Sequence, residues 1–238
     1  MNIAVIGTGR AGSSFSRALR RVGHDVQLLS HDELSSLASP ELILLCVPDD
    51  AIANVAAKIA LSDDYVVAHA AGSRTLEVLA PHRRVGSLHP LMALPDAEDG
   101  AQRLFGATYC VAGDDLVRSV ATSLGGRIIS LADSERTVYH AAAVVASNHL
   151  VALMGQVRTL AESIGLTLED FLPLANQSLR DVATLGPDEA LTGPASRGDM
   201  ATIDAHLAAL PESERATYVA LANAAFELAE RRRSHTRA

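Results

Sequence analysis

Several residue types that particular functions need are scarce or missing in this sequence. It has 238 residues, no tryptophan and only 3% aromatic residues, so a surface that stacks the bases of a single-stranded nucleic acid is not expected. Its formal net charge is −8. This charge disfavours binding to nucleic acid or to an anionic membrane, because both attract basic surfaces. We therefore expect no nucleic-acid partner and no membrane partner.

Lysine and cysteine are also scarce. Lys58 is the one lysine among 20 basic residues, so a P-loop motif and any mechanism that needs a lysine elsewhere are excluded. The two cysteines, Cys46 and Cys110, have neither a metal-binding spacing nor the spacing of a disulfide framework. The histidines and acids also lack metal-ligand spacing. We predict no metal site and a reducing, cytoplasmic environment.

No targeting or membrane segment is expected. The sequence begins with an apolar run that lacks the basic segment of a signal peptide. The longest apolar stretch, residues 141–154, is interrupted by three polar residues at 147–149, which favours a buried helix over a membrane span. The Arg-rich end, residues 231–238, is predicted to be a solvated, frayed tail.

Short apolar runs alternate with helical stretches over the first half of the chain. Strands are predicted over residues 3–6, 25–29, 42–46, 65–69, 84–88, 108–111 and 127–130, and helices over residues 11–22, 51–60, 75–79 and 116–124. This alternation is typical of βαβ units and of a parallel sheet covered on both faces. We therefore expect a doubly wound, parallel α/β domain over residues 1–132.

From residue 133 the pattern is helical throughout. Helices are predicted over residues 134–164, 168–185, 200–210 and 213–232, with prolines at their starts and breaks. The chain should therefore end in a smaller all-α domain over residues 133–238. A small helical domain built around so apolar a helix cannot cover its own surface, so we expect a homodimer packed through it.

A glycine-rich loop with G-x-G-x-x-G spacing follows the first strand and precedes the first helix. It consists of Gly7, Thr8, Gly9, Arg10, Ala11 and Gly12. In dinucleotide-binding loops the first glycine permits a tight turn, the second lets the backbone approach the pyrophosphate, and the third lets the helix pack on the strand. The helix N-terminus then favours the anion. The loop predicts a dinucleotide site; the alternative is a glycine turn that binds no ligand.

The end of the second strand indicates which dinucleotide binds. An acid there would hold the ribose 2′-hydroxyl of NAD and repel the 2′-phosphate of NADP. The strand is followed instead by Ser30 and His31, which can donate to a phosphate, and Arg10 projects from the glycine loop nearby. We expect NADP, with NAD as the alternative. Val47 and Pro48 should flank the same cofactor, because ligands of such sheets bind at the carboxyl ends of the strands.

Five short segments carry a resemblance to a known family. They are the glycine loop, V-P-D-D at 47–50, H-A-A-G-S at 69–73, G-S-L-H-P at 86–90 and L-T-G-P-A-S-R-G-D at 191–199. Nearly the whole chain resembles an uncharacterised Rossmann-like family whose C-terminal domain has no known function. More distantly, it is similar to pyrroline-5-carboxylate reductases, 6-phosphogluconate and β-hydroxyacid dehydrogenases, and F420-dependent NADP reductases. The resemblance implies a nicotinamide-dependent oxidoreductase with its active site between two domains, and it implies no particular substrate.

One departure from these relatives concerns the proton donor. β-Hydroxyacid dehydrogenases use a lysine near the start of the long interdomain helix as their acid/base group. The corresponding stretch here, residues 134–141, contains no lysine. Either another residue donates the proton, or the chemistry differs.

Histidines are the best candidates for that donor, because their pKa lies near neutral pH. His140 lies in the first turns of the long helix, and Ser147 and Asn148 follow on roughly the same face. We predict catalytic roles for His140 and Asn148 and a substrate contact for Ser147; alternatively, hydrogen bonds between helices satisfy these side chains. His89, near the carboxyl edge of the sheet, is the second catalytic candidate, unless it only shapes its loop.

Arg197 is the candidate for binding an anionic group of the substrate. Its guanidinium could clamp a carboxylate or phosphate, or it could pair with Asp199 or Asp204 instead. Two functions are open at this point. One is an NAD(P)-dependent oxidoreductase acting on a small carbonyl or imine substrate. The other is a non-catalytic NAD(P)-binding sensor or assembly protein, which would account for the missing lysine.

Overall fold

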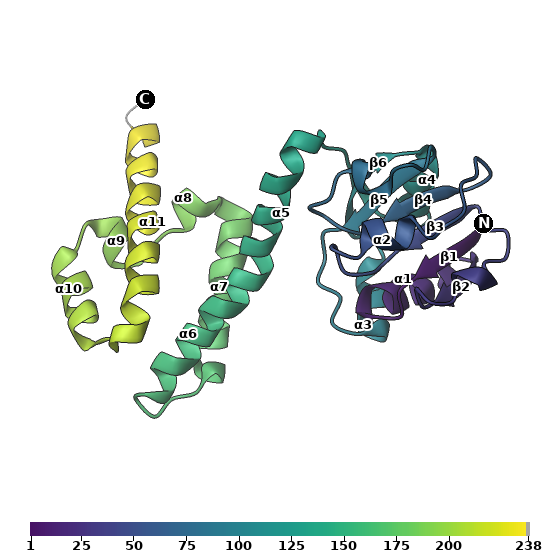
Figure 1. Ribbon diagram of the computed structural model, residues 1–238. Coiled ribbons are helices and arrows are strands. Elements are labelled where there is room, and N and C mark those ends of the chain that lie inside the picture. The colour runs from purple at the N-terminus through teal and green to yellow at the C-terminus, as the bar shows by residue number, and fades with distance from the viewer. Residues whose placement is uncertain (237–238) are drawn as a thin grey trace. The chain divides into compact units, whose positions relative to one another are not determined.

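A seven-stranded sheet forms the first part of the chain, of which the computed structural model describes residues 1–236. Its strands are β1 (Asn2–Ile6), β2 (Asp25–Leu29), β3 (Leu42–Leu45), β4 (Val66–His69), β5 (Val85–Pro90), β6 (Thr108–Gly113) and β7 (Arg127–Ile129). They lie in the order β2-β1-β3-β4-β5-β6-β7 (Figure 1). All seven predicted strands are present, and the predicted α/β class is confirmed.

One pair of neighbouring strands corrects the prediction of an all-parallel sheet. β6 runs antiparallel to β5, whereas every other pair is parallel. The connection between them forms α3 (Ala97–Leu104), a helix that was not predicted and that packs against α1 (Arg10–Arg21). The chain then re-enters the sheet where it left, since the Leu91 amide donates to the Thr108 carbonyl. For β6 to be parallel to β5, the connection would have to cross the sheet and return to the end at which β5 begins. This connection does not cross the sheet.

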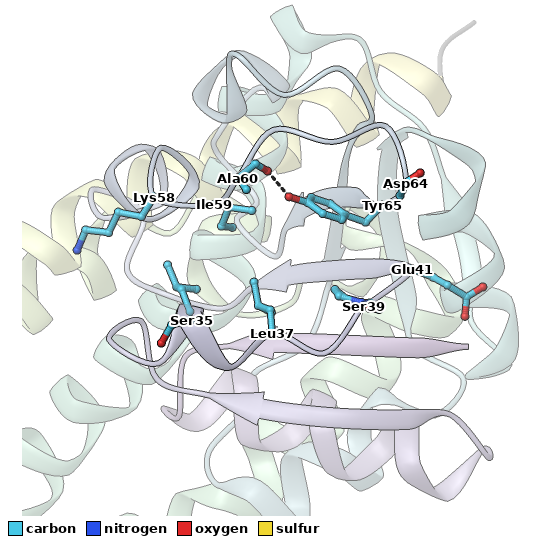
Figure 2. Close-up of a pocket in the computed structure, with 11 residues that line it drawn as sticks. Ser35, Leu37, Ser39, Glu41, Lys58, Ile59, Ala60, Asp64 and Tyr65 are labelled. Carbon is cyan, nitrogen blue, oxygen red and sulfur yellow. Dashed lines mark hydrogen bonds between the residues drawn. The ribbon is translucent and has the colours of Figure 1, made fainter.

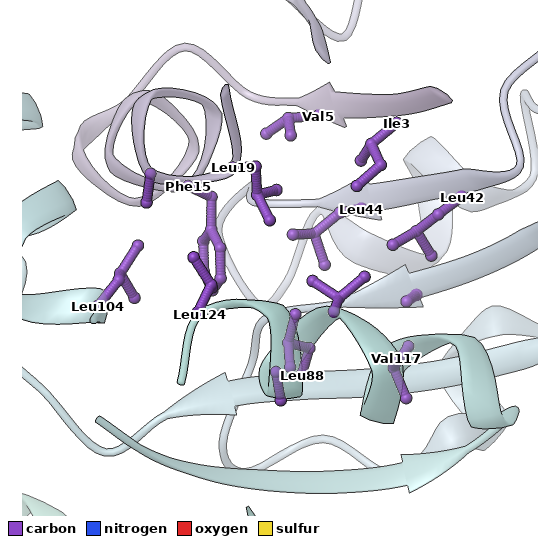
Figure 3. Packing of buried hydrophobic residues seen from close by; sticks show 14 of the residues in the cluster. Ile3, Val5, Phe15, Leu19, Leu42, Leu44, Leu88, Leu104, Val117 and Leu124 are labelled. Carbon is purple, nitrogen blue, oxygen red and sulfur yellow. The ribbon is translucent and has the colours of Figure 1, made fainter. Parts of the chain in front are cut away.

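Two buried apolar layers cover the faces of the sheet. Because alternate residues of a strand point to opposite faces, Ile3 and Val5 pack with α1, α3 and α4 (Asp115–Ser123), while Ala4 and Ile6 pack with α2 (Ile52–Ala56) and η2 (Leu76–Leu79). Figure 3 shows the first layer, into which Phe15 of α1 projects. Burial on both faces explains the near-continuous apolar runs of the central strands.

Only helices follow β7 in the described part of the chain. They are η3 (Asp133–Glu135), α5 (Arg136–Val144), the π-helical turn η4 (Val145–His149), α6 (Leu150–Glu162), α7 (Leu168–Leu185), α8 (Pro187–Ala190), α9 (Gly193–Arg197), α10 (Met200–Ala209) and α11 (Glu212–Thr236). The long predicted helix is thus interrupted by a π turn, at which the Ser147 hydroxyl donates to the Ala143 carbonyl. Such turns widen the helix by one residue. α6 and α7 lie side by side (Figure 1).

The long apolar helix is exposed within the chain, which corrects the prediction that residues 141–154 are buried. No residue of this stretch is buried, and Val145 and Val151 are 56% and 72% exposed. By length and composition alone, the run Asp133–Glu162 is apolar enough to cross a membrane, a test that core helices of soluble proteins also pass. The helices of a single chain leave this surface uncovered.

The C-terminal segment is helical rather than frayed as far as it is described. α11 continues to Thr236, because Arg232 donates to the Leu191 carbonyl and Arg231 lies 3.5 Å from the Asp188 carboxylate. Residues 237 and 238, the end of the predicted tail, lie outside the described residues.

The contacts of the chain form two compact units, Met1–Ser147 and the residues from Asn148 onward. The first unit therefore contains the sheet and also α5. The alternation of strands and helices ends before residue 132, but the contacts divide the chain about 15 residues later. A functional boundary at residue 132 stays a prediction.

Candidate active site

The backbone of the glycine loop is packed so closely that two of its glycines have no room for a side chain. A Cβ on Gly12 would lie 1.8 Å from the Gly7 carbonyl oxygen, and a Cβ on Gly7, whose φ is +117°, would lie 2.5 Å from the Cys46 carbonyl oxygen. The loop thus closes against the end of β3. Val47, which follows Cys46, lies beside the loop, with its nitrogen 3.3 Å from the same Cβ position, and Pro48 comes next; that the two flank a cofactor stays a prediction.

Gly9 differs from its neighbours because nothing lies within 4 Å of the position that its Cβ would take. It is the N-cap of α1, whose first turn has neither a side-chain cap nor an acid. Open N–H groups at a positive helix end favour a pyrophosphate. Thr8 and Arg10 are exposed and Ala11 is half-buried in the same turn. The loop residues therefore fit the phosphates of a dinucleotide.

The end of β2 carries an acid that the sequence pattern did not indicate. The Ser30 amide donates to the Glu33 carboxylate, 2.8 Å away, and this bond lowers the pKa of Glu33. His31 Nε2 lies 3.5 Å from the Asp32 carboxylate. Both residues that were expected to hold a 2′-phosphate therefore have an acid as a neighbour. Glu33 lies three residues beyond Ser30, and only the fold of this turn brings its carboxylate back to the Ser30 amide.

His89 and His140, the two predicted catalytic histidines, converge on Gly72 at the carboxyl edge of the sheet. A Cβ on Gly72 would lie 2.8 Å from His140 Nδ1 and 2.9 Å from His89 Nε2, so only glycine lets both rings approach the backbone here. The ring centroids are 6.1 Å apart. His140 Nδ1 is buried and makes no hydrogen bond to the described residues, which leaves it for a ligand atom.

Tyr139 and Arg136 complete this cluster, and the sequence analysis missed both. The Tyr139 hydroxyl lies 2.8 Å from His89 Nδ1. The Arg136 side chain is 1% exposed; it donates to Ser87 Oγ at 2.7 Å and pairs with the exposed Asp133 carboxylate at 3.0 Å. Polar residues in the first turns of a helix usually face solvent, so only their contacts with β5 show that these two belong to the site.

Burial and the Arg136 charge lower the pKa values of His69 and His89. Burial, followed by Arg136, lowers the pKa of His69 to about 4. Burial lowers the pKa of His89 to about 4 as well, with His140 as the next cause and a further contribution from Arg136. Burial also raises the pKa of Tyr139 to about 12, so its hydroxyl stays protonated. At neutral pH the cluster can donate hydrogen bonds without carrying a charge on His89.

The remaining predicted site residues lie at or beyond the π turn. Ser147 is in this turn, Asn148 opens the second compact unit, and Arg197 is exposed at the end of α9 in that unit. The extra residue of the π turn alters the helical repeat that placed Ser147 and Asn148 on the His140 face. Their roles, and that of Arg197, stay predictions. Among the described residues, no group of three His, Cys, Asp or Glu side chains is placed to hold a metal ion.

A cavity of about 640 Å³ is lined by the segments 34–41 and 58–65, which lead into β3 and β4 (Figure 2). Leu34, Leu37 and Ile59 provide its apolar lining, and Glu41 and Tyr65 directly precede β3 and β4. It is therefore near the amino ends of these strands, whereas ligands of open α/β sheets bind at the carboxyl ends. The single lysine, Lys58, lines this cavity and lies outside the histidine cluster.

The sheet order, the glycine cradle and the helices that follow define a Rossmann-like protein with a helical C-terminal part. A Rossmann-like domain matches residues 30–95, and the domain of unknown function DUF2520 matches residues 105–225, slightly more than half of the chain. The chain therefore belongs to the DUF2520 family, and the predicted resemblance is confirmed. No protein with a curated description matches the sequence.

Several solved structures share the fold at low sequence identity. A candidate NADP oxidoreductase from Bacteroides fragilis has a TM-score of 0.79 at 21% identity, over 95% of this chain and 98% of that one. Protein TM1727 from Thermotoga maritima has a TM-score of 0.77 at 22% identity, over 97% and 99%. A Plasmodium falciparum pyrroline carboxylate reductase, solved with NADP bound, has a TM-score of 0.64 at 12% identity, over 98% of each chain. At these identities the likeness shows the fold alone.

The lowered pKa values of His69 and His89 predict that stability depends on pH. Both values lie below the 6.5 of an unfolded histidine, so between pH 6.5 and 4 the unfolded chain binds protons more readily than the folded chain. The melting temperature should therefore fall as the pH is lowered through this window and should not vary for this reason above it. Calorimetry at a series of pH values checks this.

His69→Asn should flatten that pH dependence, because asparagine can still accept the Ala71 amide hydrogen bond that His69 Nδ1 accepts but does not titrate. His149→Asn, at an exposed position, is the matched control and should keep the wild-type slope. Equal slopes in all three proteins would contradict the assignment.

Proposed function

We propose that the chain is an NAD(P)-dependent oxidoreductase that binds NADP(H) and transfers a hydride to or from a small carbonyl or imine substrate. The observation that carries this proposal is the convergence of His89 and His140 on Gly72, at the same edge of the sheet as the glycine cradle. The predicted NADP specificity fits the NADP-related proteins that share the fold.

The sheet topology supports a shared site for cofactor and substrate. The cradle follows β1, the V-P-D-D loop follows β3, and Gly72 follows β4. These parallel strands are neighbours in the order β1-β3-β4-β5, so their carboxyl ends meet at one edge. The Ser73 hydroxyl donates to the Asp49 carboxylate at 2.9 Å, which ties the loop after β4 to the loop after β3. A dinucleotide held by the cradle would extend along this edge towards the histidines.

The residues of the chain would hold the cofactor and supply the proton. Gly7, Gly9 and Gly12 form the cradle for the pyrophosphate. When bound, a reduced nicotinamide supplies the hydride. His140 or His89 would donate the accompanying proton to the oxygen or nitrogen of the substrate, in place of the lysine of β-hydroxyacid dehydrogenases. A general acid of this kind contributes roughly 10²–10⁴-fold to the rate.

Cofactor binding provides the first test. Calorimetric titration should show tighter binding of NADPH than of NADH. Glu33→Gln should increase this preference about tenfold or more, because the Glu33 carboxylate bound to Ser30 opposes the charge of a 2′-phosphate. Glu77→Gln, which removes an exposed carboxylate elsewhere, should leave both affinities unchanged.

Gly9→Val controls for the location of the cofactor. Because the space at the Gly9 Cβ position is open, the variant should fold with an unchanged melting temperature and lose affinity for both cofactors. Equal or reversed affinities of the wild-type protein for NADPH and NADH would overturn the NADP preference.

Turnover provides the second test, in a screen of small ketoacids, aldehydes and imines for NADPH oxidation. With an active substrate, His140→Ala should lower kcat by roughly 10²–10⁴-fold, the range for a lost general acid. An unchanged rate in a folded variant would remove His140 as the donor and shift the role to His89. Tight cofactor binding without turnover across the screen would favour the non-catalytic sensor.

We also propose that the chain forms a homodimer through its helical part. Beyond residue 136, the buried apolar residues of the described chain are only Ala161, Ala195, Ile203 and Ala229. Of 16 exposed large hydrophobic side chains among the described residues, 13 lie between Val138 and Leu221. An exposed apolar surface of this extent marks an association site, and a second copy offers the same surface by symmetry.

Sedimentation at micromolar concentration should give twice the chain mass of 25.0 kDa. Val151→Asp should produce a monomer, because it places a charge on a side chain that is 72% exposed within one chain. Leu61→Asp, at a position 64% exposed in the sheet unit, should remain dimeric. A monomeric wild-type protein would refute the dimer. If the wild-type protein could be purified only with lipid vesicles or detergent, the exposed apolar surface would instead be a membrane contact.

A further inference from the structure

We infer that Tyr139 is a positioning residue that fixes the proton of His89 on Nε2, the ring nitrogen that faces Gly72 and His140. The inference rests on the proposed function, because it explains how His89 is prepared to donate a proton. It also makes a claim about the free protein that can be tested without cofactor or substrate.

The hydrogen bond between Tyr139 and His89 decides which ring nitrogen carries the proton. The two atoms, Tyr139 Oη and His89 Nδ1, are 2.8 Å apart. A neutral imidazole has one donor and one acceptor nitrogen, so a phenol that donates to Nδ1 leaves the proton on Nε2, and a phenol that accepts from Nδ1 leaves Nε2 bare. The imidazole lone pair is a stronger base than a phenol oxygen. Donation by Tyr139 is therefore the favoured arrangement.

The surroundings of His89 favour the neutral ring that this argument requires. The His89 side chain is half-buried, and the buried guanidinium of Arg136 donates to Ser87 Oγ, two residues earlier on β5. A second positive charge beside this buried cation would be unfavourable. The titratable and charged groups that surround the ring come from several elements: Tyr139, His140 and Arg136 of α5, His69 of β4, Asp49 after β3, and Cys110 opposite His89 on β6.

Gly72 and His140 determine what the fixed proton faces. His89 Nε2 and His140 Nδ1 both lie within 2.9 Å of the point that a Gly72 Cβ would occupy. When the His89 Nε2 proton passes to the substrate, the Tyr139 hydroxyl proton can pass to Nδ1, so that the ring stays neutral and Tyr139 becomes a phenolate. A proton from water at Nε2 then lets the Nδ1 proton return to the phenolate of Tyr139, which is only partly buried. This restores the starting tautomer, so that Tyr139 would both orient the donor and keep its ring neutral.

Long-range ¹H–¹⁵N spectra of the full ¹⁵N-labelled chain test the inference, with His89→Gln to assign the His89 signals. At pH 7 the wild-type protein should show a protonated Nε2 and an unprotonated, hydrogen-bonded Nδ1. Tyr139→Phe should shift the Nδ1 resonance and raise the pKa of His89 by about one pH unit, because a hydrogen bond to the neutral ring is lost. With an active substrate, the same variant should lower kcat more than it changes KM.

A second tyrosine–histidine pair provides the matched control. Tyr218 and His206 have the same contact at 2.6 Å with a ring angle of 87°, but at an exposed position. Tyr218→Phe should affect the His206 signals and leave those of His89 unchanged. A protonated Nδ1 on His89 in the wild-type protein would overturn the inference even if Tyr139→Phe failed to fold, as would a folded Tyr139→Phe protein with unchanged His89 signals. Failure of NADPH to bind would contradict the proposed function and would leave these spectra unaffected.

Discussion

The candidate site depends on close backbone contacts that only glycine permits. At Gly12 a Cβ would overlap the Gly7 carbonyl oxygen, and at Gly72 it would press on two imidazole rings. The first contact brings α1 against β1 with its open N-terminus at the edge of the sheet. The second lets side chains from β5 and α5 meet beside the loop after β4. Cradle and histidine cluster therefore follow from the same property, the absence of a side chain at the carboxyl edge of a parallel sheet.

Arg136 gives this edge its electrostatic character. It lies in the stretch, residues 134–141, that corresponds by resemblance to the lysine-bearing helix start of β-hydroxyacid dehydrogenases, and its buried guanidinium donates to Ser87 and pairs with Asp133. An arginine side chain keeps its proton near neutral pH, so Arg136 cannot serve as a general acid. Its charge instead contributes to the lowered pKa values of His69 and His89. This stretch thus carries a fixed charge, and in the proposed reaction the protons that move are those of His89, His140 and Tyr139.

The sequence predicted the parts of this structure that depend on local patterns. Apolar runs located all seven strands, and the G-x-G-x-x-G spacing located the cradle. Both features depend on residues that are close together in the sequence. The direction of β6 was missed, since an apolar run is the same in either direction and only the path through α3 decides it. Glu33 was missed because a three-residue turn brings its carboxylate back to Ser30.

The histidine cluster shows the same limit within the site. His89 and His140 could be proposed from their positions at a strand end and a helix start. Tyr139 and Gly72 could not, because their importance comes from contacts between distant segments: Tyr139 meets His89, 50 residues earlier, and Gly72 lies beside His140 of α5. For the same reason the burial of Arg136 could not be predicted from the sequence. Pairwise contacts of this kind depend on the tertiary fold, which local periodicity does not encode.

The helical part places a further constraint on the site. Tyr139 and His140 lie on α5, in the same helical run, Asp133–Glu162, that carries the exposed Val145 and Val151. Burying apolar surface contributes roughly 25 cal/mol per Å², so covering this run is favourable and would restrict its motion. A partner surface that covers this run would also restrict α5, the helix that carries Tyr139. The proposed association through the helical part would therefore act on the histidine cluster through the helical run Asp133–Glu162.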